Sequence, residues 1–298
     1  MKNRILVATR PSKLALKQTE IVVDMLKKKF PELEVEIVKV STKGDLGHQN
    51  LSLNLKSAFT YDIETLLIDG KVDVAIHSLK DLPSNLDDRL TIIATPSRED
   101  PRDVLVSKDG KKLEDLPLGS RLGTSSLRRK VQLRYLRKDI EIMDIHGNVD
   151  TRISKFEKLN LDGVILAAAG LIRLGMHEKI SQFFKIEDIV PAPGQGIIAV
   201  EILKRRKDLS ELFGEINDND IFRAALCERS FMDKIGGGCD VPTGIYAEVK
   251  KEEIRAIAFL ASSDGSRMVK RTYFGRAEEP MKFGAMIADE IRKELKNA

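Results

Sequence analysis

The sequence has few cysteines, no tryptophan and no long apolar run. Two cysteines in 298 residues, Cys227 and Cys239, cannot form a disulfide framework. Four histidines without a Cys-x-x-Cys motif give no basis for a metal site, so we expect no metal. No apolar run reaches the roughly 18 residues of a membrane helix, and the first residues lack a signal-peptide pattern. These absences predict a cytoplasmic protein without a membrane partner.

The net charge of the chain is also small, at +4. The 50 Lys and Arg residues nearly balance 46 Asp and Glu residues, and aromatic residues make up only 5%. A nucleic-acid binder needs a basic stripe or aromatic stacking platforms, so we expect no nucleic-acid partner. The hydrophobic fraction of 42% is enough for a buried core and excludes a disordered chain.

Short apolar strands alternate with amphipathic helices over the first hundred residues. Strand patterns at 4–9, 34–40 and 72–76 are separated by helical periodicity at 12–30 and 59–68. The alternation resumes after residue 103, with helices at 127–136 and 151–159 and a strand at 163–167. This order predicts an α/β fold with parallel strands.

Two polar crossings that contain proline, at 97–103 and 191–196, predict that the chain leaves one domain and later returns to it. We therefore expect domain 1 at 1–97 and 197–215, and domain 2 at 102–191. From residue 218 a helix, three alternating strands and a last helix predict a small α+β domain at 218–298.

Cationic residues recur where predicted strands end. They are Arg10, Lys80, Arg128, Arg129, Arg152 and Arg173. The carboxyl ends of strands line the ligand crevice in open α/β sheets, and helix N-termini there attract anions. One such arginine is typical of a solvated helix face, but six at equivalent positions predict an anion site between two domains. Because arginine binds carboxylate and phosphate equally well, this pattern leaves the anion open.

Two residues could add chemistry to that site. Asp81 directly follows Lys80, where it either balances charge or stabilises a developing cation on a substrate. Cys239 follows three glycines, which allow a ligand to approach closely, although a lone cysteine is more often a small buried hydrophobe. Cys227 lies in a helical pattern and is interpreted as structural.

Several motifs in order resemble the hydroxymethylbilane synthase family, also called porphobilinogen deaminase. They are ATRPSKLALKQ at 8–18, VAIHSLKDLP at 74–83, REDPRD at 98–103, GTSSLRR at 123–129, PAPGQG at 191–196 and GGGC at 236–239. The resemblance implies two domains like type II periplasmic binding proteins, with mixed, mainly parallel sheets, plus a small C-terminal α+β domain.

The resemblance also implies an activity. Four porphobilinogens would be joined head to tail with loss of ammonia, and water would then release hydroxymethylbilane. A dipyrromethane cofactor, one per chain, would be bound to Cys239 through a thioether. Asp81, Arg10 and Lys80 would be catalytic, and Asp81 would stabilise the cation left when ammonia departs. The chain is expected to be a monomer whose partner is the small molecule porphobilinogen.

The remaining site residues are likewise implied by the resemblance. Besides Cys239, the cofactor would contact Ser78, Lys80, Asp81, Thr124, Ser125, Ser126, Arg128 and Arg129. The substrate would contact Arg10, Ser12, Gln18, Phe59, Arg152, Arg173, His146 and Lys56, with Arg10, Ser12, Arg152 and Arg173 at positions that bind acetate or propionate groups or the cofactor.

The chain departs from the family pattern in two places. His146 stands where the family usually has arginine, so it is either a pH-dependent substitute or a residue that only packs at its turn. The segment around Lys56 and Phe59 lacks the family's glycines and a later basic residue. An alternative function is a non-catalytic carboxylate-binding module on the same scaffold, because fold does not fix function.

Overall fold

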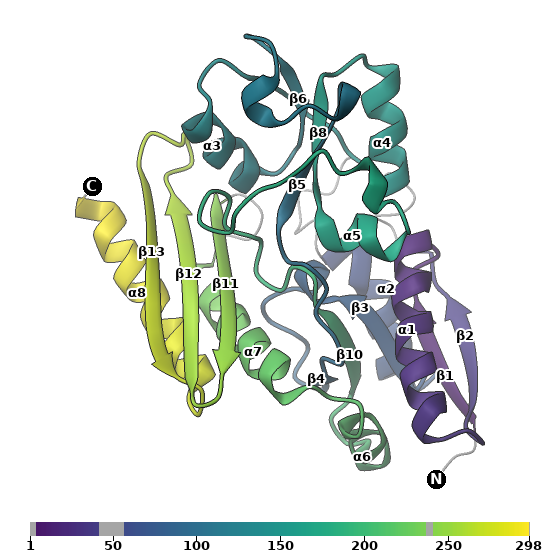
Figure 1. Cartoon of the computed structure of the whole chain (residues 1–298). Helices are drawn as coiled ribbons and strands as arrows, with labels where there is room; N and C mark the ends of the chain where they lie inside the picture. The colour runs from purple at the N-terminus through teal and green to yellow at the C-terminus, as the bar shows by residue number, and fades with distance from the viewer. Residues whose placement is uncertain (1–3, 42–56, 237–240, 298) are drawn as a thin grey trace. The chain divides into compact units, whose positions relative to one another are not determined.

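The computed structural model describes residues 4–41, 57–236 and 241–297. These residues form two compact units (Figure 1). The first unit contains residues 1–98 and 197–225, and the second contains residues 99–196 and 226–298. The predicted division into three domains, with its boundaries, stays a prediction.

The first unit is built on a five-stranded sheet in the order β2-β1-β3-β10-β4. Its strands are β1 (Arg4–Thr9), β2 (Glu34–Lys39), β3 (Val74–Ser78), β4 (Leu90–Ala94) and β10 (Ile198–Leu203). Its helices are α1 (Lys13–Lys29), α2 (Ser57–Ile68) and α6 (Lys207–Gly214). The helix α7 (Asn219–Ile235) begins in this unit and continues into the second.

Alternating side chains give this sheet two buried faces, as expected for a strand with period two. One core contains Val7 and Val74 together with residues of α1 and α6. The opposite core contains Ala8 and Ala75 together with Ile63 of α2. The Ser12 hydroxyl accepts a hydrogen bond from the Ala15 amide at 3.3 Å and caps α1, so the predicted helix start is confirmed.

The second unit repeats the arrangement with a sheet in the order β7-β6-β8-β5-β9. Its strands are β5 (Asp103–Ser107), β6 (Arg121–Gly123), β7 (Glu141–Met143), β8 (Gly163–Ala167) and β9 (Gln182–Phe183). Its helices are α3 (Leu127–Leu136), α4 (Val149–Lys158) and α5 (Ala168–Arg173). Leu105 and Ile165 contribute to the core beneath α3, whereas Val104 and Val164 face α4 and α5.

A smaller antiparallel sheet completes the second unit. Its strands are β11 (Thr243–Lys250), β12 (Glu253–Ala261) and β13 (Met268–Arg276), and the last helix is α8 (Pro280–Asn297). Figure 1 shows α8 lying along this sheet, where it packs against β12 and β13. Gly284 of α8 meets the backbone of α7 at Cys227, so the two helices cross closely.

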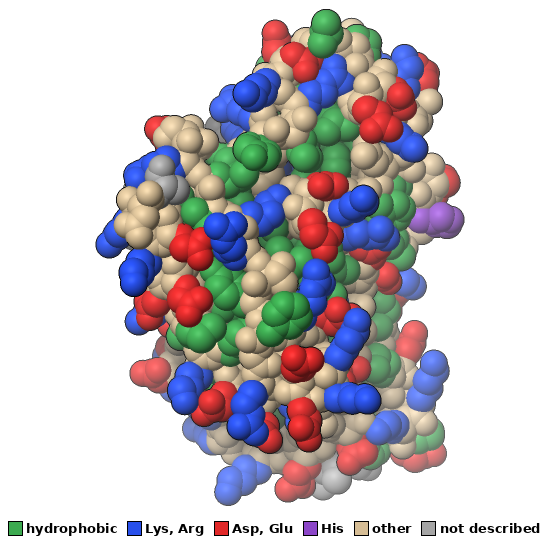
Figure 2. All heavy atoms as spheres, turned by 60° about the vertical axis from the view of Figure 1, so that its left-hand side comes forward, with side chains coloured by type: hydrophobic (Ala, Val, Ile, Leu, Met, Phe, Trp, Pro, Cys, Tyr) green, Lys and Arg blue, Asp and Glu red, His purple; other side chains and the backbone are tan. Residues whose placement is uncertain are grey.

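The predicted α/β class, with two sheet domains and a small C-terminal α+β part, is confirmed. Strand direction differs in detail from the prediction. In each five-stranded sheet two pairings are parallel and two are antiparallel, because β10 and β5 run against their neighbours. On the face drawn in Figure 2, cationic and anionic side chains are interspersed, as the near balance of charge leads one to expect.

Candidate functional site

The first unit presents the Ser78–Asp81 turn at the carboxyl end of β3. Leu79 and Leu82 are 2% and 0% exposed and hold this turn in the core, while Lys80 and Asp81 between them are half-buried. The Leu79 amide donates to the Ile197 carbonyl at 3.0 Å, and the Leu82 amide donates to the Leu79 carbonyl at 3.2 Å. The alternation of apolar and charged residues therefore fixes the turn and leaves its two charged side chains toward the surface.

Other predicted residues lie at the same edge of this sheet. β1 pairs with β3 in parallel, so Arg10 at the end of β1 and the Ser78–Asp81 turn are at one edge. Gln18 is buried, and its side-chain amide is hydrogen bonded to the Ser78 hydroxyl at 2.9 to 3.0 Å. Ser12 caps α1 at this end of the sheet. The structure thus brings six predicted site residues together on the first unit: Arg10, Ser12, Gln18, Ser78, Lys80 and Asp81.

The second unit presents a corresponding edge, where β6, β7 and β8 run parallel. The residues that follow β6 are Thr124, Ser125 and Ser126, and α3 then begins. A Cβ at Gly123 would lie 2.9 Å from Leu161, so glycine permits the close approach of this segment to the core. His146 follows β7, and Arg173 ends the helix that follows β8.

The most strongly charged feature of this edge is buried. Arg128 and Arg129, both 6% exposed, share the fully buried carboxylate of Asp103. Arg128 Nη1 and Arg129 Nη2 each lie 2.6 Å from that carboxylate, and Arg129 Nε lies 3.1 Å from it. Arg128 also donates to the Val190 carbonyl at 2.6 Å, and Arg129 donates to the Ile165 carbonyl at 3.0 Å.

The charges in this cluster do not balance. Burial alone would raise the pKa of Asp103, but the charges of Arg128 and Arg129 hold it well below the usual range. Burial is also the main cause that lowers the pKa of Arg128, with repulsion from Arg129 acting in the same direction. Two guanidinium groups and one carboxylate leave one positive charge in excess, and a buried excess charge favours an anionic ligand.

A turn from the second crossing, at 191–196, holds Asp103 from another side, and this contact was not predicted. Gln195 Nε2 donates to Asp103 at 3.0 Å and to the Pro101 carbonyl at 2.7 Å. Glu228 of α7, which is fully buried, accepts from the Gly194 amide at 2.6 Å and from the Ala247 amide at 2.7 Å. Asp103 and Gln195 are polar residues inside the motifs at 98–103 and 191–196, but no contact was assigned to either of them from the sequence.

His146 is exposed and lies beside a predicted cofactor contact. Its Nε2 lies 3.1 Å from the Ser125 hydroxyl, which is also hydrogen bonded to the backbone of Ile145. Lys155 donates to the His146 carbonyl at 3.0 Å. The structure therefore places this imidazole next to Ser125, but whether it carries a charge toward substrate stays a prediction.

The two other arginines of this edge differ in burial. Arg152 is half-buried, and its Nε donates to the Gly147 carbonyl at 2.7 Å. Arg173 is 9% exposed and donates to the Gly196 carbonyl at 2.7 Å. Burial lowers the pKa of Arg173 to about 10, against the opposing charge of Glu99, and the group stays cationic at neutral pH.

Three predicted positions cannot be placed in this way. Lys56 and Cys239 lie outside the described residues, and of Phe59 only the backbone, in α2, is described.

Cys227 is a buried free thiol of α7, as expected, and burial raises the pKa of its thiol. Among the described residues no His, Cys, Asp and Glu side chains gather in a metal-binding group. None of the described helices combines the length and hydropathy of a membrane span.

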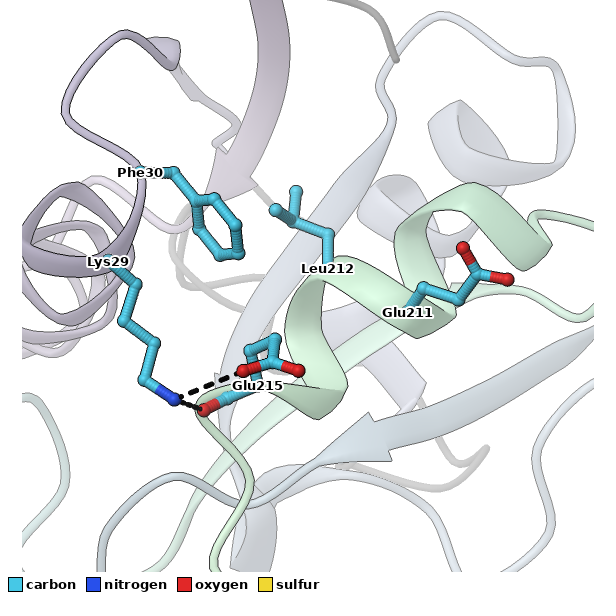
Figure 3. A pocket seen from close by; sticks show the side chains of 5 residues that line it. All are labelled: Lys29, Phe30, Glu211, Leu212 and Glu215. Atoms are coloured by element: carbon cyan, nitrogen blue, oxygen red, sulfur yellow. Dashed lines mark hydrogen bonds and ion pairs between the residues drawn. The ribbon is translucent and has the colours of Figure 1, made fainter.

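A hollow of about 450 Å³ lies elsewhere on the first unit (Figure 3). It is lined by Lys29, Phe30, Glu211, Leu212 and Glu215. Lys29 Nζ is already paired with the Glu215 carboxylate at 3.3 Å, and Phe30 and Leu212 face one another across the hollow. No predicted site residue lines it, so the hollow is not part of the candidate site.

Comparison with known proteins covers almost the whole chain. The family model "Porphobilinogen deaminase, dipyromethane cofactor binding domain" matches residues 5–211, and "Porphobilinogen deaminase, C-terminal domain" matches residues 222–293. In the solved structure of the methionine-binding protein MetQ, similarity covers 76% of this chain and 95% of that chain, at 14% identity and a TM-score of 0.46.

Curated relatives agree with the family models. The porphobilinogen deaminase of Alkaliphilus metalliredigens is 42% identical over 96% of this chain and 92% of its own length. That of Clostridioides difficile is 41% identical over 98% of both chains. Both relatives are named as deaminases, that is, as enzymes, so a non-catalytic carboxylate-binding module is not favoured. With both domain models and full-length relatives in agreement, the chain belongs to the porphobilinogen deaminase family.

Proposed function

We propose that this chain joins four porphobilinogens head to tail on a dipyrromethane primer held by Cys239 and then releases hydroxymethylbilane by hydrolysis. The observation that carries the proposal is the buried excess of positive charge where Arg128 and Arg129 share Asp103. Each pyrrole ring of cofactor and substrate carries an acetate and a propionate. Such carboxylates supply the anion that this edge of the sheet favours.

The described residues fit the cofactor. Ser126 stands at the N-terminus of a ten-residue helix, and the hydroxyls of Thr124 and Ser125 before it are hydrogen bonded to the backbone of Ser126 and Ile145, which holds this segment in place. Amides at a helix N-terminus favour carboxylates. On the first unit, Ser78 and Lys80 offer a hydroxyl and an ammonium group. When bound, the dipyrromethane supplies the pyrrole carbon to which the first substrate is joined.

Asp81 is the residue that we assign to the chemical step. As a half-buried carboxylate at a turn fixed by Leu79 and Leu82, it is preorganised to accept pyrrole N–H groups. Its negative charge would stabilise the positive charge that develops on the substrate as ammonia leaves. Lys80 and Arg10, at the same sheet edge, would hold substrate carboxylates so that the reacting carbon lies near Asp81.

The other substrate contacts are assigned by position. Ser12 and Gln18 lie with Arg10 on the first unit, whereas Arg152, Arg173 and His146 follow strands of the second. Lys56 and Phe59 belong to the proposal through the family pattern.

We also propose that the chain acts as a monomer in the cytoplasm. The proposed cofactor contacts and the proposed substrate contacts are all residues of one chain, so a second copy is not needed. Size-exclusion chromatography with light scattering tests the oligomeric state.

Asp81→Ala tests the proposal against a matched control. In purified, cofactor-loaded protein we expect kcat for porphobilinogen to fall on the order of 100-fold or more, because one preorganised electrostatic partner is lost. Thermal unfolding should stay near wild type. Asp88→Ala removes an exposed carboxylate from the following loop and should leave kcat unchanged. Wild-type turnover by Asp81→Ala would reject this assignment.

A further inference from the structure

A buried polar cluster lies directly behind the Ser78–Asp81 turn. His77 Nε2 lies 3.2 Å from Glu201 Oε2, and the two side chains are 3% and 0% exposed. Strand register pairs Ala75 with Glu201, and His77 is two residues further along β3, so both groups face α2. Glu64 of α2 is the third member, because its Oε1 is also buried without a hydrogen-bond partner among the described residues, and the charges of both groups act on it.

The polar atoms of this cluster are not fully satisfied. Within the part of the chain that the structure describes, His77 Nε2 and both carboxylate oxygens of Glu201 are buried without a hydrogen-bond partner. The imidazole and carboxylate are within ion-pair distance, but their geometry is not that of a hydrogen bond. Buried polar groups of this kind are rare in native proteins and call for an explanation.

Stability does not explain the cluster. Apolar residues of similar volume in place of a buried ion pair are often neutral or stabilising. The surrounding side chains, such as Ile63 and Leu67, already form an apolar core that could accommodate such a replacement. Retaining three ionisable groups there therefore points to a role in geometry or function.

The position of the cluster indicates what that role is. His77 is followed directly by Ser78, and β10 supplies Glu201, while Ile197, directly before β10, accepts a hydrogen bond from the Leu79 amide. Glu64 is less than two turns after the start of α2. The cluster thus joins α2 and β10 to the strand end that carries the turn.

Repulsion between like charges limits which groups of the cluster can be ionised together. Fully deprotonated, the two carboxylates would place one negative charge on the buried Glu201 and a second on the half-buried Glu64. Burial is the main cause that raises the pKa of Glu64, the charge of Glu201 raises it further, and Asp87 adds a smaller effect in the same direction. The Thr60 hydroxyl and the charge of His77 act in the opposite direction, but the net effect is a raised pKa of Glu64.

We propose that His77, Glu201 and Glu64 form a positioning cluster that fixes the Ser78–Asp81 turn for the reaction. The residues do not touch substrate, and they act through the backbone of β3 and β10. The catalytic part of this inference rests on the proposed function of Lys80 and Asp81, whereas the structural part does not.

The double variant His77→Leu/Glu201→Leu separates positioning from stability. Because both partners are replaced, we expect its thermal unfolding to lie at or above that of wild type, whereas Glu201→Leu alone leaves His77 buried without its partner and should unfold at a lower temperature. In cofactor-loaded protein kcat should fall ten- to a hundredfold, on the order expected for a misplacement of about 1 Å, with less change in KM. Glu201→Gln, which keeps the shape and polarity, should restore most of kcat. Thr95→Val removes another buried, unpartnered hydroxyl just after β4 and should change neither quantity.

Hydrogen exchange gives a readout that does not depend on turnover. The amides of Leu79 and Leu82 should exchange faster in the double variant than in wild type, while the amides of β1 should not change. Should the double variant fail to fold, His77→Asn removes the same contact and should give the same pattern. Unchanged exchange and unchanged kcat in a folded variant would overturn the inference. A wild-type protein that does not convert porphobilinogen would reject the proposed function, and the exchange result would still decide the role of the cluster.

Discussion

Asp103→Asn should destabilise the second unit strongly. The Asp103 carboxylate is fully buried and receives four hydrogen bonds, three from Arg128 and Arg129 and one from Gln195. Asparagine keeps the size of the side chain but removes its charge, so two buried guanidinium groups lose their counter-ion. Breaking a buried ion pair in this way costs about 3–5 kcal/mol, a large fraction of the about 5–15 kcal/mol that typically stabilises a protein.

Urea unfolding followed by circular dichroism measures this loss. Glu187→Gln is the matched control, because Glu187 pairs with Arg255 at 3.1 Å with both side chains exposed. That change should cost less than about 1 kcal/mol. Because the folded-state pKa of Asp103 is depressed, its contribution is complete above about pH 3.9 and is lost only as pH falls further. The difference between Asp103→Asn and wild type should therefore be constant from pH 5 to 8. A difference no larger than that of Glu187→Gln would refute the reasoning.

Three further predictions concern packing and pH. Gly284→Ala should lower the free energy of unfolding by about 1–3 kcal/mol in a denaturant titration, because a Cβ there meets the Cys227 carbonyl. Gly214→Ala, where a Cβ has open space, should be neutral or stabilising, and equal effects at both glycines would contradict this account. Wild type should lose stability as pH rises from about 4.3 through the raised pKa of Glu64, and Glu64→Gln should lack this loss in melting curves that begin at about pH 4. His146→Arg, which places a permanent positive charge beside Ser125, should change the pH dependence of the apparent affinity for porphobilinogen, whereas identical pH profiles of the two proteins would show that the side chain at position 146 has no charge role.

Elements with a strong apolar pattern could be predicted from the sequence. The strand at 163–167 and the helix at 127–136 have the predicted bounds as β8 and α3. The strands β4 (Leu90–Ala94) and β5 (Asp103–Ser107) were not predicted, because each is a short apolar run after a polar loop. Strand direction could not be read either, since a strand has the same pattern in both directions.

The sequence predicted which residues lie at the sheet edges, but not which of them are buried. Residues that follow parallel strands meet at one sheet edge, and this rule placed Arg10 with Lys80. Burial of arginine has no comparable signal, because an exposed and a buried guanidinium look alike in sequence. The partners of Arg128 lie 25 and 62 residues away, at Asp103 and Val190, and only the fold brings them together.

The mass of the intact, denatured protein tests the central claim most directly. A thioether at Cys239 survives denaturation, unlike a ligand held by ion pairs. Protein made by cells with a supply of porphobilinogen should show an excess of two porphobilinogen units, each minus ammonia, and added substrate should give a ladder of further single-unit steps. Cys239→Ser should lose both signals. An active wild-type protein with the bare mass of the 298-residue chain would contradict the covalent-primer mechanism.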